Sequence, residues 1–100
     1  RAEVAALIRH YMGNAEILVA AAKDCGLETF GGTNAPYIWV RGPEGLTSWE
    51  IFDTVLMKAN VVVTPGSGFG PAGEGYFRIS SFNSRTNVGE VAARLRALEW

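Results

Sequence analysis

A long amphipathic segment at the start of the chain constrains the fold most. Apolar residues recur every three or four positions from Val4 to Ala22, which predicts a helix of about 24 residues within positions 1–26. At about 1.5 Å per residue this helix is about 36 Å long, whereas a compact domain of 100 residues has a radius of gyration of about 13 Å. The helix is as long as the domain is wide, so we expect it to connect this domain to a second one. The apolar positions are Val4, Leu7, Ile8, Tyr11, Met12, Ala15, Leu18, Val19 and Ala22.

The two ends of this helix differ in their sequence signals. Gly26 can adopt the left-handed conformation that closes a helix. At the start, no Ser, Thr, Asp, Asn or Pro precedes the periodic residues, so the first turn has no capping side chain. The chain begins with Arg1 and shows no signal peptide. We therefore expect that processing or truncation has removed what came before.

Alternating and helical patterns follow Gly26. A short strand is predicted over residues 27–30 and a second over residues 36–41, with Ile38 and Val40 on one face. Thr47 and Glu50 match a capping box, and the helix that they begin has a buried stripe as far as Ala59, with Asn60 as its stop. That stripe consists of Ile51, Phe52, Val55, Leu56 and Ala59.

Two further strands and a last helix complete the pattern. Residues 61–64 and 76–81 read as strands, and the last helix has an apolar stripe from Val88 to Leu98. Its cap is Asn83, Ser84 or Asn87, among which the sequence does not decide.

The order of these elements predicts the fold class. Helix, strand, strand, helix, strand, strand, helix is typical of an α/β two-layer sandwich, with helices on one face of a small, mostly antiparallel or mixed sheet. We expect residues 1–26 to form the interdomain helix and residues 27–100 the sandwich. The other face of the sheet then needs a partner.

Charge and composition exclude several classes of function. Nine basic and ten acidic side chains give a net charge of −1, which lacks the basic excess of a nucleic-acid module. The longest apolar run has six residues, Ile17 to Ala22, against about 20 for a membrane span. The single cysteine, Cys25, and the lack of a Cys/His cluster leave no internal disulfide or metal site and favour an intracellular protein.

The most unusual stretch is glycine-rich, over residues 66–75. It contains a formal G-x-G-x-x-G at Gly68, Gly70 and Gly73, but a dinucleotide site needs the third glycine to open a helix, and here a strand follows. Two interpretations remain open. The stretch is either a flexible surface loop or a backbone that approaches a ligand or another chain closely.

Among candidate functional side chains, Arg78 stands out. It lies in a strand between Phe77 and Ile79, so its long cation must leave the core face. It either covers the outer sheet surface or directs its guanidinium to a carboxylate, which the planar fork matches well. We expect His10 to be a surface or boundary residue and Glu74 to be solvated or to have a turn role.

Three runs of residues carry a resemblance to a known family. They are N-A-P-Y-I-W at residues 34–39, T-P-G-S-G-F-G at residues 64–70 and G-E-G-Y-F-R at residues 73–78. The chain resembles, over essentially all 100 residues, the C-terminal small domain of class I/II pyridoxal-phosphate-dependent aminotransferases. The first run and the G-S-G-F-G variant point to the diaminopimelate branch of that family.

The resemblance implies roles for residues of this chain. Arg78 would bind the α-carboxylate of the amino acid or 2-oxo acid substrate, and residues 66–75 would lie at the mouth of the site and shift as the domain closes. Asn34 would begin a segment near the cleft. LL-diaminopimelate and 2-oxoglutarate are the implied substrates, which places the reaction in lysine biosynthesis, in a homodimer of the cytoplasm or a plastid.

The resemblance also implies what this chain lacks. Transamination needs a Schiff-base lysine, an acidic partner for the pyridinium nitrogen and groups that hold the cofactor phosphate. Lys23 and Lys58 are the only lysines, and both fall on helices outside the family motifs. We therefore expect no catalytic, cofactor-binding or metal-binding residue here, a large domain that binds pyridoxal phosphate elsewhere, and an inactive isolated chain. The alternative is a non-enzymatic α/β module that uses its uncovered sheet face for protein association.

Overall fold

The computed structural model describes residues 2–31, 37–59, 63–98 and 100. Within these residues the order of helices and strands is the predicted one. The elements are α1 (Ala2–Asp24), β1 (Thr29–Gly31), β2 (Tyr37–Arg41), α2 (Ser48–Thr54), β3 (Thr64–Pro65), β4 (Tyr76–Ser80) and α3 (Arg85–Arg96), with short turns η1 (Val55–Ala59), η2 (Gly66–Phe69) and η3 (Pro71–Gly73).

The strands form one sheet in the order β1-β2-β4-β3, in which every neighbouring pair is antiparallel. The first strand begins later than predicted because the backbone N–H of Leu27 donates to the carbonyl of Ala22 at 3.0 Å and so completes the end of the helix. Of the strand predicted over residues 61–64, positions 61 and 62 lie outside the described residues, and the described ladder begins at Thr64.

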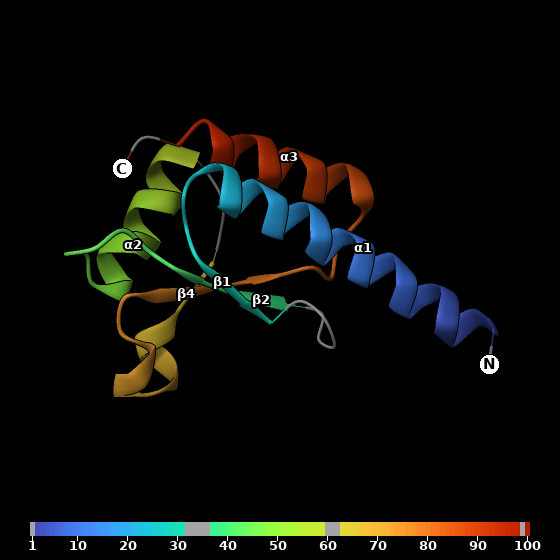
Figure 1. Ribbon diagram of the computed structural model, residues 1–100, viewed down its shortest axis with the longest axis horizontal. Coiled ribbons are helices and arrows are strands. Elements are labelled where there is room, and N and C mark those ends of the chain that lie inside the picture. The colour runs from blue at the N-terminus through green and yellow to red at the C-terminus, as the bar shows by residue number, and fades with distance from the viewer. Residues whose placement is uncertain (1, 32–36, 60–62, 99) are drawn as a thin grey trace.

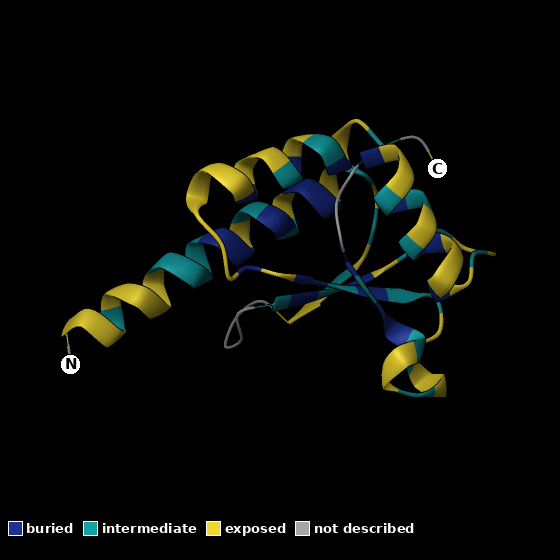
Figure 2. Ribbon diagram, turned by 180° about the vertical axis from the view of Figure 1, so that it is seen from behind, coloured by how far each residue is buried: buried dark blue, intermediate teal, exposed yellow. Residues whose placement is uncertain are grey.

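The α-helices lie on one face of the sheet, which confirms the two-layer prediction (Figure 1). Buried residues gather where the helices and the sheet face each other (Figure 2). Ile38 and Val40 of β2 and Phe77 and Ile79 of β4 point into this core, as their alternation predicts. Their partners from the helices include Leu18, Ile51, Val55, Val88 and Leu95.

The long helix α1 projects beyond the sandwich (Figure 1), and the principal extents of the whole chain are 44 × 28 × 20 Å. In its second half one face is buried, at Asn14, Ala15, Leu18, Ala21 and Ala22, whereas the predicted apolar stripe of its first half is largely uncovered by the described residues. Val4, Leu7 and Ile8 are 51%, 52% and 56% exposed. The apolar face of the helix is thus buried along only part of its length.

The second helix begins where the sequence predicts and ends differently. Thr47 accepts a hydrogen bond from the N–H of Glu50, and the Glu50 carboxylate accepts one from the N–H of Thr47, which confirms the capping box. After Thr54 the backbone widens into the π-helical turn η1, which the apolar stripe does not predict. At this junction the Thr54 hydroxyl donates to the Glu50 carbonyl at 2.8 Å, a bond that commonly accompanies a distorted helix. The predicted stop, Asn60, lies outside the described residues.

A buried polar contact joins α1 to the segment after β4. Asn14 is fully buried, and its amide N–H groups donate to the carbonyls of Ser81 and Asn83 at 3.0 and 2.8 Å. Its carbonyl oxygen accepts from Nε of Arg85 at 2.6 Å. Ser84 is the N-cap of α3, with its hydroxyl accepting from the N–H of Asn87 at 3.1 Å, which settles the choice among the three predicted caps.

Candidate functional site

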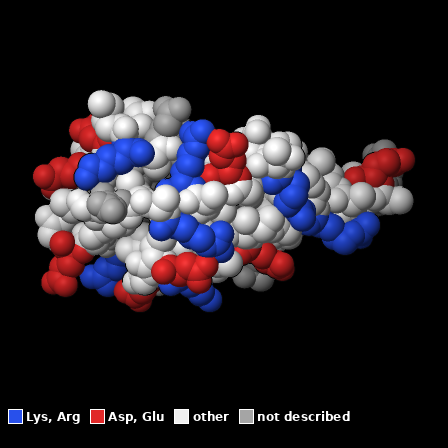
Figure 3. Space-filling model, turned by 90° about the horizontal axis from the view of Figure 1, so that it is seen from above, with Lys and Arg blue, Asp and Glu red and all other residues white. Residues whose placement is uncertain are grey.

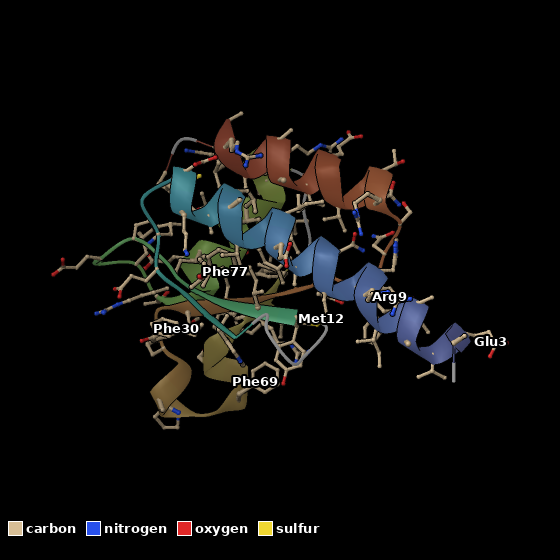
Figure 4. All side chains as sticks on the ribbon, turned by 45° about the vertical axis from the view of Figure 1, so that its right-hand side comes forward. Glu3, Arg9, Met12, Phe30, Phe69 and Phe77 are labelled. Atoms are coloured by element: carbon tan, nitrogen blue, oxygen red, sulfur yellow. The ribbon has the colours of Figure 1, made fainter. Side chains whose placement is uncertain are left out.

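The face of the sheet opposite the helices carries aromatic and charged side chains. Tyr37 and Trp39 of β2 and Tyr76 and Arg78 of β4 alternate with the core residues and are partly exposed. Figure 4 shows Phe30 and Phe69 below the sheet and Phe77 above it, among the helices. The sheet therefore has one buried face and one face that is available to a ligand or a partner.

Arg78 is the charged centre of this open face. Its Cζ atom lies 4.9 Å from the centroid of the Tyr37 ring and 4.7 Å from the centroid of the Phe69 ring. Among the described residues, no carboxylate lies within salt-bridge distance of Arg78. The guanidinium lies against ring faces, and its N–H donors have no anionic partner in the described part of the chain, an arrangement that can receive a carboxylate.

The glycine-rich stretch that precedes β4 borders Arg78. It is not irregular throughout, because η2 and η3 are single turns of 3₁₀-helix. Gly66 and Gly73 approach so closely that a Cβ atom on either would collide with the backbone carbonyl of the other. This close approach is between two parts of this chain, whereas the interpretation from the sequence was an approach to a ligand or another chain. The strand that follows, β4, excludes the helix that a dinucleotide site requires.

The base of the stretch is fixed to the start of α2. The Ser48 hydroxyl, which is fully buried, accepts from the N–H of Gly75 at 2.8 Å and lies 3.0 Å from the carbonyl oxygens of both Gly73 and Tyr76, to either of which it can donate. The Glu74 carboxylate accepts from the N–H of Ser48 at 2.6 Å. The Glu74 carboxylate therefore lies at the N-terminus of a helix, where a negative charge is favoured.

An apolar pocket of about 280 Å³ adjoins Arg78 on the open face. The Phe69 ring separates the two, since it contacts Arg78 and also meets Trp39 edge-on, with 5.2 Å between the ring centroids. The pocket has few polar groups and opens onto the uncovered face of the sheet. Its lining residues are Phe30, Trp39, Phe69, Ala72, Gly73 and Tyr76.

The other titratable candidates lie away from this site. Nε2 of His10 lies 3.1 Å from the carbonyl oxygen of Asn83, at the junction of α1 and the end of β4. Cys25 follows the end of α1, and burial raises the pKa of its thiol, with Asp24 adding to the effect and Arg96 opposing it. Asn34 lies outside the described residues. No group of three His, Cys, Asp or Glu side chains that could hold a metal ion occurs in the described part of the chain.

The lysines do not meet at the open face. Lys23 lies in the last turn of α1 and Lys58 in η1, and both are exposed on the helical layer. Basic and acidic side chains alternate over that layer (Figure 3). Of the described helices, none is long and apolar enough to cross a membrane.

Sequence reasoning missed two residues, Phe69 beside Arg78 and the buried Asn14 of α1. Phe69 has no periodic pattern to mark it, and its contact with Arg78 depends on how η2 folds back over the sheet. The buried Asn14 was hidden in an otherwise apolar stripe, where a polar residue at a core position is itself a signal of a specific contact.

Comparisons with known proteins bear on what this site binds. No protein-family model matches the chain. The LL-diaminopimelate aminotransferase of Prochlorococcus marinus (strain MIT 9211) is 52% identical over 98 residues, which are 98% of this chain and 24% of that protein. The solved structure of L,L-diaminopimelate aminotransferase from Chlamydomonas reinhardtii superposes with a TM-score of 0.91 at 46% identity, over 97% of this chain and 24% of that one.

This chain resembles one part of an aminotransferase. The resemblance extends beyond one branch, because the aromatic aminotransferase from Pyrococcus horikoshii OT3 superposes with a TM-score of 0.83 at 34% identity, over 89% of this chain and 24% of that one. The architecture is that of the small domain of these aminotransferases, as the sequence motifs predict. The chain spans about a quarter of the length of the relatives that it matches.

Proposed function

We propose that this chain is the substrate-closing small domain of a pyridoxal-phosphate-dependent aminotransferase, and that Arg78 binds the α-carboxylate of its substrates. The observation that carries the proposal is a guanidinium on the open face of the sheet, held between Tyr37 and Phe69, with no carboxylate partner among the described residues. A planar guanidinium offers paired N–H donors that match both oxygens of a carboxylate. The similarity to aminotransferases supplies that carboxylate as part of an amino acid or a 2-oxo acid.

The surroundings of Arg78 suit an ion pair with a small ligand. The rings of Tyr37 and Phe69 cover part of the guanidinium, which is partly exposed. An ion pair in such a place is stronger than one in open water, because the effective dielectric constant is lower. We propose LL-diaminopimelate as the amino donor and 2-oxoglutarate as the acceptor, in lysine biosynthesis, because both diaminopimelate aminotransferases match nearly the whole chain.

We propose that the described residues do not hold pyridoxal phosphate by themselves. Lys23 and Lys58 lie on the helical elements α1 and η1, whereas Arg78 lies on the open face of the sheet. When bound, the cofactor supplies the electron sink for amino-group transfer. We propose that the remaining three quarters of the polypeptide bind it as a large domain and complete a homodimer in the cytoplasm or a plastid.

The exposed half of α1 fits the same proposal. Val4, Leu7 and Ile8 continue the buried stripe of the helix without cover from the described residues. Phe82, which is 61% exposed, lies beside this stripe through an edge-on contact with Tyr11 at 4.6 Å between ring centroids. We propose that the rest of the polypeptide covers this surface, with residues 1–26 as the interdomain helix.

The experiment replaces Arg78 in the complete enzyme. We expect Arg78→Lys to weaken binding of the amino acid by about 2 to 5 kcal/mol, or about 30- to 4,000-fold, while the cofactor stays bound. Arg41→Lys is the matched control, because Arg41 lies at the exposed end of β2 and pairs with Glu28 at 3.5 Å. An unchanged kcat/KM in the Arg78→Lys enzyme would show that Arg78 does not bind the substrate.

A further inference from the structure

The guanidinium of Arg78 is held by two rings that come from different parts of the chain. Tyr37 opens β2, the strand beside β4, and Phe69 ends the 3₁₀ turn η2. Their ring centroids lie 4.9 and 4.7 Å from Cζ of Arg78. Both distances are within the range of a cation–π interaction, which is about 6 Å. Neither ring belongs to the hydrophobic core, because both side chains lie on the open face.

The chemistry of this contact leaves the donors of Arg78 available. A ring face attracts the flat surface of a guanidinium, whereas the N–H bonds point outward in the guanidinium plane. A carboxylate approaches in that plane, so ring contact and carboxylate binding are compatible. A carboxylate side chain in place of a ring would instead occupy the donors.

Phe69 is itself held in place. Its ring meets Trp39 edge-on at 5.2 Å between centroids, and its turn begins at Gly66, which is packed against Gly73. The other end of the glycine-rich stretch is tied to Ser48. The glycine-rich stretch therefore fixes the position of the Phe69 ring. The glycines allow the close backbone packing that places this ring against Arg78.

We propose that Tyr37 and Phe69 are positioning residues, which hold the Arg78 guanidinium in the orientation that receives the substrate carboxylate. The inference rests on the proposed function of Arg78 and adds that the two rings fix the orientation of its guanidinium before the substrate binds. A long side chain that is fixed before the ligand arrives loses less conformational entropy on binding. Removing either ring should therefore weaken carboxylate binding even though neither ring touches the carboxylate.

The test compares ring-removing and ring-retaining substitutions in the complete enzyme. We expect Phe69→Leu and Tyr37→Leu each to lower kcat/KM for the amino acid by about 3- to 10-fold, mainly through KM. Phe69→Tyr and Tyr37→Phe keep a ring face and should stay within about twofold of the parent enzyme. Phe69 is 55% exposed, so the leucine variant should fold, and an unchanged thermal midpoint would verify this.

A double-mutant cycle separates positioning from a general structural effect. In the Arg78→Met background, Phe69→Leu should change kcat/KM by less than about twofold, because the ring then has no guanidinium to hold. An equal loss in both backgrounds, or no loss from either leucine substitution in the parent enzyme, would overturn the positioning role. If Arg78→Met itself leaves kcat/KM unchanged, the proposed function of Arg78 fails instead, so the two failures are distinguishable.

Discussion

Substituting Gly13 by alanine tests how α1 is attached to the segment after β4. Gly13 lies in the interior of α1, where alanine is favoured over glycine by about 1 kcal/mol. However, a Cβ atom at Gly13 would lie 2.6 Å from Nη2 and 3.2 Å from Cζ of Arg85. The guanidinium rests on the helix because glycine leaves room for it, so the substitution must displace Arg85.

The displaced contacts decide the sign of the effect. Arg85 donates from Nε to the buried Asn14 at 2.6 Å and from Nη2 to the carbonyl of His10 at 3.0 Å. A hydrogen bond to a charged group contributes about 1.5 to 3 kcal/mol, and a buried acceptor left without a donor costs a similar amount. Subtracting the gain of about 1 kcal/mol from the helix leaves a net destabilisation of about 0.5 to 2 kcal/mol for Gly13→Ala.

Urea unfolding of the chain, followed by circular dichroism, measures this difference. Gly89→Ala is the matched control, since Gly89 lies inside α3 and a Cβ there meets nothing within 4 Å. We expect Gly89→Ala to raise the free energy of unfolding by about 1 kcal/mol, and Gly13→Ala to do the same only in the Arg85→Ala background. If Gly13→Ala stabilises the parent chain as much as Gly89→Ala does, the contact with Arg85 contributes nothing and the reasoning is refuted.

Two further predictions concern Cys25 and the isolated chain. Because the pKa of the Cys25 thiol is raised in the folded state, its stabilising contribution is present below the pKa of the unfolded thiol and is lost as the pH rises through the folded pKa. The rate of alkylation by iodoacetamide should therefore rise at higher pH in the native chain than in urea, and coincident profiles would contradict the burial of the thiol. The isolated 100-residue chain should show neither aminotransferase activity nor a saturable, stoichiometric absorbance change with pyridoxal phosphate; such a band would mean that Lys23 or Lys58 forms a cofactor site.

The sequence predicted those helix ends that are fixed by contacts between residues close in the sequence. Thr47 and Glu50 are three positions apart, so the start of α2 follows from a contact within one turn. Gly26, with φ of 78°, ends α1 as expected. The cap of α3, Ser84, is also a contact within one turn, but Asn83 and Asn87 offered the same capping chemistry, so the sequence did not choose among them. The contact of Asn14 with Asn83 joins residues about 70 positions apart, and a polar residue in the apolar stripe does not reveal its partner.

The candidate site was also predictable only where it depends on local patterns in the sequence. Strand alternation places Arg78 on the face opposite Phe77 and Ile79, and the structure has it there. Alternation also places Tyr37 on that face. Its position next to Arg78 depends on the pairing of β2 with β4, which the alternation within one strand does not predict. Phe69 reaches Arg78 only through the fold of the glycine-rich stretch, whose 3₁₀ turns the sequence did not predict.

The central claim is that Arg78 receives a substrate carboxylate, and a crystal structure of the complete enzyme with 2-oxoglutarate bound tests it most directly. We predict that two guanidinium nitrogens of Arg78 lie about 2.7 to 2.9 Å from the two oxygens of one carboxylate, with Tyr37 and Phe69 still against the guanidinium. A bound 2-oxoglutarate whose carboxylates are all held by other residues, with Arg78 out of contact, would contradict the account.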